Sequence, residues 1–368
     1  MQEHIWNEVI VKKIIVFVSC IIVSLSAGAA AVDIVDLYGI DQPISEAIIK
    51  KYAKEISHIE LYLQEEFARA LPGEEINDST EKIVKKREAL IEKITKEYGF
   101  KFVDFQTVLY PNNDTVYTTI EVVDKDHPER LRFVSVDPMG HHVKEEGKNR
   151  TDLIDKMIEY TNTGFRLLMD HQLSAKLSSC PVYHCVVGFE HPKLKRYLTM
   201  FNQGAIKERS FIIETLNHDN DPERRAAAAF LVGHFRDPHE IITVLSSHVG
   251  DKNEGVRNNV MRVIAETIVK AHITQLDVAP FLDALDSPYT TDRNKALWVL
   301  LGVVDDKVSS LPIIQNGGDK LLALLQLKQP NNHDLAYSIL KKISGKDFGP
   351  TNVAAWTKWV STAKNQAT

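Results

Sequence analysis

The residues of this 368-residue chain that could do chemistry are histidines and cysteines gathered between positions 141 and 191. The histidines are His141, His142, His171, His184 and His191. Imidazole groups in this number could hold a zinc or copper ion. However, their spacing is irregular, and adjacent histidines usually point in different directions. We therefore interpret them as solvated loop residues and predict neither a metal ion nor a cofactor.

Cys180 and Cys185 lie in the same region, five residues apart. A redox-active pair usually has Cys-x-x-Cys spacing at the start of a helix, and this pair does not have that spacing. In an oxidising compartment an even pair of cysteines tends to form a disulfide. We predict a disulfide that closes a short loop and fixes local geometry. A redox or metal-binding protein centred on residues 141–191 remains the alternative.

Residues 1–31 predict export. Lys12 and Lys13 precede an apolar stretch from Ile14 to Leu25, and small residues follow up to Ala31. This order is typical of a cleaved secretory signal peptide, which predicts a periplasmic or secreted protein. Residues 14–32 could also just span a bilayer. If that segment stays uncleaved, the protein would be a membrane-anchored assembly factor.

The composition limits the possible partners and activities. The formal charge is −6, from 44 basic and 50 acidic side chains, so the chain has no global positive field that would hold a phosphate backbone. Nucleic acid is therefore excluded as the expected partner. The chain also contains no glycine-rich phosphate loop, no Gly-x-Ser-x-Gly motif and no His-Glu-x-x-His motif. We predict a protein that is not an enzyme and has no catalytic residues.

Residues 32–137 predict a small α+β domain. A strand at 32–37 precedes two helical stretches that end at Leu71-Pro-Gly73 and at Gly99, and a hairpin follows over residues 100–123. Residues 131–136 predict a third strand of the same sheet, whose helices should lie on one face. The polar segment 138–151 is the predicted linker. Residues 152–200 predict a helical segment that carries the Cys180/Cys185 loop.

A resemblance covers part of this first domain. Ile34-Val-Asp-Leu-Tyr-Gly-Ile40, Glu97-Tyr-Gly-Phe100 and Thr118-Thr-Ile-Glu-Val122 are its short motifs. With them, residues 32–125 look like the polypeptide-transport-associated module of outer-membrane assembly proteins. The helical portion is longer here than in that module. The resemblance implies no functional residues in this chain.

Residues 201–362 contain a repeat. Arg225-Ala-Ala-Ala-Ala229, Arg257-Asn-Asn-Val260 and Arg293-Asn-Lys-Ala296 recur at spacings of 32 and 36 residues, and a weaker copy begins at His333. This period is typical of stacked helix pairs. The periodicity predicts four hairpins, each written as a first and a second helix: 206–216 and 224–235, 239–249 and 255–269, 278–285 and 293–304, and 320–327 and 335–343.

Two sets of repeat positions have predicted structural roles. Ala228, Val260 and Ala296 should lie on the buried face of each second helix. Arg225, Arg257 and Arg293 begin those helices, where a guanidinium can bind the carbonyls and acids of the preceding turn. The acids expected there are Asp221, Asp251 and Asp286. The alternative is an arginine ladder that binds an acidic partner.

Asp221-Pro-Glu-Arg-Arg225-Ala-Ala-Ala228 and its weaker copies resemble HEAT repeats, and the resemblance covers about residues 195–360. The tail is similar to the closing segment of bacterial HEAT-repeat proteins, with Trp356 and Trp359 as the cap. The expected fold is thus an α+β N-terminal domain followed by an all-α HEAT-like solenoid. The resemblance implies a scaffold or adaptor that binds a protein partner on the concave face, which the second helices line.

Overall fold

The computed structural model describes residues 32–69, 77–110, 115–135, 151–174, 177 and 179–366. The predicted signal peptide and the predicted linker up to Arg150 lie outside these residues. The described chain divides into two compact units. The first contains the residues up to Val134 together with Pro288–Thr290 and Gln326–His333, and the second contains the rest. Within the described ranges, no helix is both long and apolar enough to cross a membrane.

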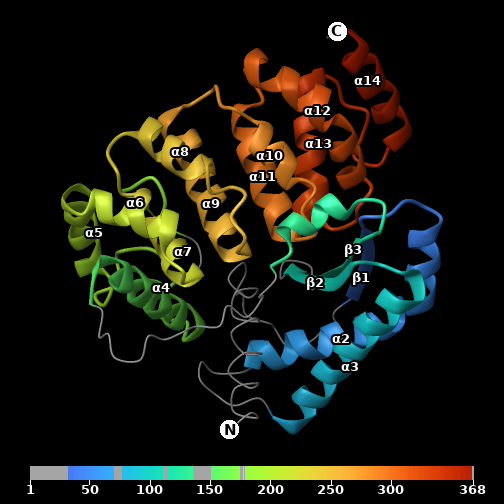
Figure 1. Cartoon of the computed structure of the whole chain (residues 1–368), viewed down its shortest axis with the longest axis horizontal. Helices are drawn as coiled ribbons and strands as arrows, with labels where there is room; N and C mark the ends of the chain where they lie inside the picture. Colours follow the sequence, from blue (N-terminus) through green and yellow to red (C-terminus); the bar gives the residue numbers. More distant parts are fainter. Residues whose placement is uncertain are drawn as a thin grey trace. The chain divides into compact units, whose positions relative to one another are not determined.

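The first unit contains a three-stranded sheet (Figure 1). Its strands are β1 (Val32–Tyr38), β2 (Phe102–Tyr110) and β3 (Thr115–Val123), arranged in the order β1-β3-β2. β2 and β3 form the antiparallel hairpin that their alternating residues predict, whereas β1 pairs with β3 in parallel. The helices α2 (Ile44–Arg69) and α3 (Asp78–Tyr98) connect β1 to β2, which makes this unit α+β.

One face of the sheet packs against these two helices. Ile48, Tyr52 and Ile56 of α2 and Ile94 of α3 are almost fully buried in the same apolar cluster as Phe105, Ile120 and Val122 of the sheet. The ends of α3 follow from the local sequence. The Asn77 side chain accepts a hydrogen bond from the Thr80 amide, and Gly99 adopts a left-handed conformation with φ of 70°.

The side chains of a strand alternate between its two faces. The other face of this sheet carries buried polar side chains. Its buried polar residues are Asp36, Gln106, Thr119 and Glu121. Asp36 and Gln106 bind backbone groups of the same unit that lie far along the chain. Asp36 Oδ2 accepts from the amide of Gln329 at 3.0 Å, and Gln106 Oε1 accepts from the amide of Thr290 at 2.6 Å. Polar side chains here therefore fix two turns to the sheet.

The predicted third strand at 131–136 is wrong for the residues that the structure describes. Pro128–Phe133 forms a 3₁₀ helix instead. Pro128 fixes the φ angle that begins the helical turn, and both edges of β3 are already paired. Arg130 then donates to the carbonyl oxygens of Gly39 and Val122, at 3.2 and 2.9 Å. Leu131 and Phe133 alternate as a strand would, but this alternation reflects the burial of Phe133 in the turn.

The second unit is helical (Figure 1). Its helices are α4 (Leu153–Met169), α5 (Lys195–Lys207), α6 (Arg209–His218), α7 (Pro222–Val232), α8 (Pro238–Ser246), α9 (Glu254–Ala271), α10 (Ala279–Ala284), α11 (Thr290–Val303), α12 (Lys307–Leu325), α13 (Pro330–Ser344) and α14 (Val353–Gln366). The first residue of α11 and the first turn of α13 belong to the first unit. The helices α6 to α13 fall where the sequence period predicts four helix pairs. Neighbouring helices pack together, α6 on α7, α8 on α9, and α7 on α9.

One predicted boundary is wrong. The first helix of the fourth pair begins at Lys307 and not at Lys320, and it contains Pro312 and the pair Gly317 and Gly318. The two glycines allow other helices to approach closely. A Cβ atom on Gly317 would lie 2.6 Å from Leu282, and one on Gly318 would lie 2.7 Å from Val360. The residues that suggest a helix break are therefore packing positions of α12.

Candidate functional site

The three repeat arginines share one backbone contact. Nη1 of Arg225 donates to the carbonyl oxygen of Asp219 at 2.9 Å, and Nη1 of Arg257 donates to that of Asp251 at 2.8 Å. Nη1 of Arg293 donates to that of Ser287 at 2.7 Å. Each acceptor lies six residues before its arginine. The repeat sequence thus produces the same turn geometry three times, with the arginine bound to the carbonyl of its own turn as predicted.

The carboxylates differ from the prediction. Arg225 binds Asp251 through Nε and Nη2, at 3.1 and 2.9 Å, and Arg257 binds Asp292 at 2.7 Å. Both acids belong to the following helix pair and not to the arginine's own turn. Asp221 instead caps α7 by accepting from the amide of Glu223. The acids of adjacent pairs are close enough to bind because the pairs stack, and the sequence period alone does not reveal this.

Arg224 forms internal ion pairs that the sequence did not suggest. Its side chain is buried, and it lies against Asp152 and Asp155 at the start of α4 and Asp219 in the turn before α7. It donates to Asp152 Oδ2 and Asp219 Oδ2 at 2.8 Å each. The available clue in the sequence was the adjacent pair Arg224-Arg225. Arg224 binds acids at the start of α4, whereas Arg225 binds Asp251 in the turn before α9. Arg224 thereby extends the chain of ionic links from α7 back to α4.

The structure buries the predicted repeat positions and one of the two predicted cap residues. Ala228, Val260 and Ala296 are fully buried. Trp356 of α14 is also fully buried, and its Nε1 donates to the carbonyl oxygen of Gly349 at 2.8 Å. The Trp359 ring contacts the Trp356 ring edge-on and is partly exposed. Both tryptophans belong to α14, the last helix of the chain, and α14 packs on α12.

A second position also recurs on the second helices. Phe230, Arg262 and Trp298 each stand five residues after their repeat arginine. Their exposure differs, since Phe230 is 6% exposed whereas Trp298 is 50% exposed. Phe230 is covered because the imidazole ring of His184 stacks on it, with ring centroids 5.1 Å apart. The same position is thus occupied by the chain itself on α7 and open on α11.

The segment that covers Phe230 is the disulfide loop. Cys180 and Cys185 are joined, and between them the amide of Tyr183 donates to the carbonyl oxygen of Gly233 at 3.2 Å. Lys270 of α9 donates to the carbonyl oxygen of Val182 at 2.7 Å. The loop is therefore bound to both α7 and α9 through its backbone.

His184 anchors the same loop by its side chain. Its Nδ1 lies 2.9 Å from Oε1 of Glu266 on α9. Burial lowers the pKa of His184, more than Glu266 raises it. Burial raises the pKa of Glu266, but the contact with His184 and the charges of Lys270 and Arg262 together outweigh this effect, so the pKa is lowered. A neutral imidazole beside a charged carboxylate satisfies both directions.

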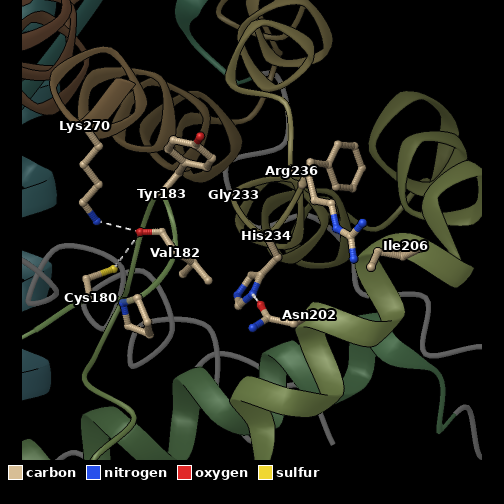
Figure 2. Close-up of a pocket in the computed structure, with 11 residues that line it drawn as sticks. Cys180, Val182, Tyr183, Asn202, Ile206, Gly233, His234, Arg236 and Lys270 are labelled. Atoms are coloured by element: carbon tan, nitrogen blue, oxygen red, sulfur yellow. Dashed lines mark hydrogen bonds between the residues drawn. The ribbon is translucent and has the colours of Figure 1, made fainter. Parts of the chain in front are cut away.

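A pocket of about 530 Å³ lies beside this loop (Figure 2). Four segments line it: residues 180–183 of the loop, Asn202 and Ile206 of α5, residues 233–236 between α7 and α8, and α9 with Lys270 at one end. Figure 2 shows the His234 ring against the Asn202 amide, with Nδ1 2.8 Å from Oδ1. Burial lowers the pKa of His234 to about 3, so the ring is neutral at pH 7. The sequence did not suggest this pocket because its residues share no period.

The histidines predicted from sequence do not gather at one place. His141 and His142 lie outside the described residues. His171 has a left-handed backbone with φ of 54° just after α4, and His191 accepts from the amide of Lys193. His184 is buried against Phe230, so its interpretation as a solvated residue is wrong. Across the described ranges, no group of three or more metal-binding side chains comes together.

No protein-family model, no curated protein and no solved structure matches this chain.

Proposed function

We propose that this protein is an exported, non-enzymatic scaffold that binds another protein along the second helices of a HEAT-like solenoid. The observation that carries the proposal is the pair of links between successive helix pairs, Arg225 to Asp251 and Arg257 to Asp292. Both links run from a repeat arginine to an acid of the following helix pair, Asp251 in the turn before α9 and Asp292 in the first turn of α11, so they support the stacking of adjacent pairs. Stacked repeats of this kind present an extended surface for a partner.

The open repeat position on α11 supports the same function. Trp298 is half exposed, and tryptophan is among the residues that most often dominate the binding energy of an interface. At the equivalent position of α7, Phe230 already holds the imidazole ring of His184, which belongs to the disulfide loop. We propose that a partner places a ring of one of its loops on Trp298 in a comparable way. The disulfide between Cys180 and Cys185 supports the exported location, since such bonds persist in oxidising compartments.

Site-specific photo-cross-linking tests the proposal. A benzoylphenylalanine residue at position 298, on a second helix, should capture a protein partner in the exported fraction. The matched control is position 308, an exposed apolar residue at the start of the first helix α12. Trp298→Ala should reduce recovery of that partner by tenfold or more, as expected for an aromatic hot spot worth about 2 kcal/mol. Equal capture at both positions, or undiminished recovery with Trp298→Ala, would contradict the proposal.

A further inference from the structure

The pocket beside the disulfide loop carries an uneven charge. Its lining contains Arg236 and Lys270 but no aspartate or glutamate. Lys270 is partly engaged, because it donates to the Val182 carbonyl and lies 3.8 Å from Glu266. Arg236 is exposed, and among the described residues no group forms a hydrogen bond or ion pair with its guanidinium. A guanidinium offers five donors arranged for a planar anion, and the protein leaves these donors available.

The Asn202 amide also lines the pocket. The Asn202 Oδ1 atom lies 2.8 Å from His234 Nδ1, and an amide oxygen can only accept, so the neutral imidazole carries its proton on Nδ1. This contact fixes the orientation of the amide, whose Nδ2 has two protons to donate. In Figure 2 the Arg236 side chain lies beside Ile206, whereas the Asn202 amide lies against the His234 ring.

Apolar side chains also line the pocket. Tyr183, Ile206 and Phe235 contribute to the lining, and Ile206 is 52% exposed. The volume of about 530 Å³ lies within the usual range for small-ligand pockets, roughly 300–1,000 Å³. A ligand with an apolar body would cover Ile206, while its charged head meets Arg236.

We propose that this pocket binds a carboxylate attached to an apolar body, with Arg236 as the ion-pairing residue. The carboxylate belongs to a free organic acid or to the C-terminus of a peptide, which present the same chemistry. A single available guanidinium suits a monoanionic, planar head group. This site is separate from the surface around Trp298, so it does not depend on the scaffold function.

Calorimetric titration of the full-length protein tests this site. The ligands are phenylacetate and hexanoate, their neutral counterparts phenylacetamide and hexanamide, and Ala-Ala-Phe with a free or an amidated C-terminus. We expect saturable binding of at least one carboxylate, at least tenfold tighter than its amide. Binding by the free peptide alone identifies a peptide C-terminus as the ligand, and binding by the small acids alone identifies a free acid. If no carboxylate binds at millimolar concentration, or if the amides bind equally well, the proposal is overturned.

Two variants assign the binding to this pocket. Arg236→Gln should weaken the carboxylate about tenfold or more and leave the weaker binding of the amide unchanged. Arg166→Gln is the matched control, because Arg166 is an exposed arginine of α4 that does not line the pocket and its replacement removes the same charge. Arg236 is exposed, so its replacement should leave the melting temperature unchanged. Equal weakening by both variants would show a general charge effect and overturn the assignment.

Discussion

Arg257 of α9 and Asp292 of α11 form a fully buried ion pair between two helix pairs. Nε and Nη2 of Arg257 each lie 2.7 Å from Oδ2 of Asp292, and both side chains have 0% exposure. Ser287 donates to the same carboxylate oxygen at 2.6 Å, and Arg257 also donates to the Asp251 carbonyl. The pair therefore connects the turn before α9 to the start of α11 in the interior of the helical unit.

Removing one partner should be costly. Arg257→Ala or Asp292→Ala leaves a buried charge without its counter-ion, and we expect each to lower the free energy of unfolding by about 3–5 kcal/mol. Chemical denaturation of the purified protein measures this change. The double variant Arg257→Met/Asp292→Leu should lose less than either single variant, because it leaves no buried charge. Lys342→Ala, which removes an exposed pair with Asp305, should cost about 1 kcal/mol or less.

The buried alanines of the second helices test the packing of the helix pairs. Ala228→Asp or Ala296→Asp would place a carboxylate in a fully buried position without a partner, so each should lower the melting temperature by several degrees or prevent folding. Ala354→Asp, at an exposed position in the first turn of α14, is the control and should leave the melting curve nearly unchanged. Unchanged melting of both buried variants would show that the helix faces are assigned wrongly.

His234 should make stability depend on pH. Burial lowers its native pKa to about 3, whereas an unfolded histidine has a pKa of about 6.5. Between these values the unfolded chain binds a proton that the native protein does not. Stability from this group is therefore complete above pH 6.5 and decreases as the pH falls, by at most about 1.4 kcal/mol per unit.

Denaturation curves between pH 7 and pH 4 measure this effect. His234→Gln keeps a donor for Asn202 but cannot be protonated, so its stability should fall less steeply with acid than that of the wild type. His239→Gln replaces an exposed histidine of α8 and should reproduce the wild-type pH dependence. If the His234→Gln curve stays parallel to the wild-type curve, the native ring is not held neutral.

The disulfide should make a modest contribution to the free energy of unfolding and should hold its loop in place. For a loop of this length, the chain-entropy estimate is about 2 kcal/mol. Reduction, or Cys180→Ser/Cys185→Ser, should cost about that much in denaturation. It should also release the amide of Tyr183, which donates to Gly233, so that this amide exchanges faster with deuterium. A reducing agent should not alter the double serine variant, and an unchanged Tyr183 exchange rate would contradict the role of the disulfide.

Several features followed from local patterns that the sequence contains. The 32- and 36-residue spacings of Arg225, Arg257 and Arg293 predicted the helices of successive pairs and the hydrogen bonds to their own turn carbonyls. These are interactions between residues close in the chain, so composition and spacing are enough to specify them. The α+β character of the first unit followed in the same way from the alternation and periodicity of its segments.

The tertiary structure decided which distant groups meet. It paired Arg257 with Asp292 instead of an acid of its own turn, it used Gln106 to hold Thr290, and it covered Phe230 with His184. It also assembled the pocket from four separate segments, the disulfide loop, α5, the turn between α7 and α8, and α9. No period or spacing determines these contacts, because they depend on how whole helices and strands pack. The sequence thus determined the local elements by short-range periodicity and capping, whereas the burial of polar and charged groups against distant segments fixed the site.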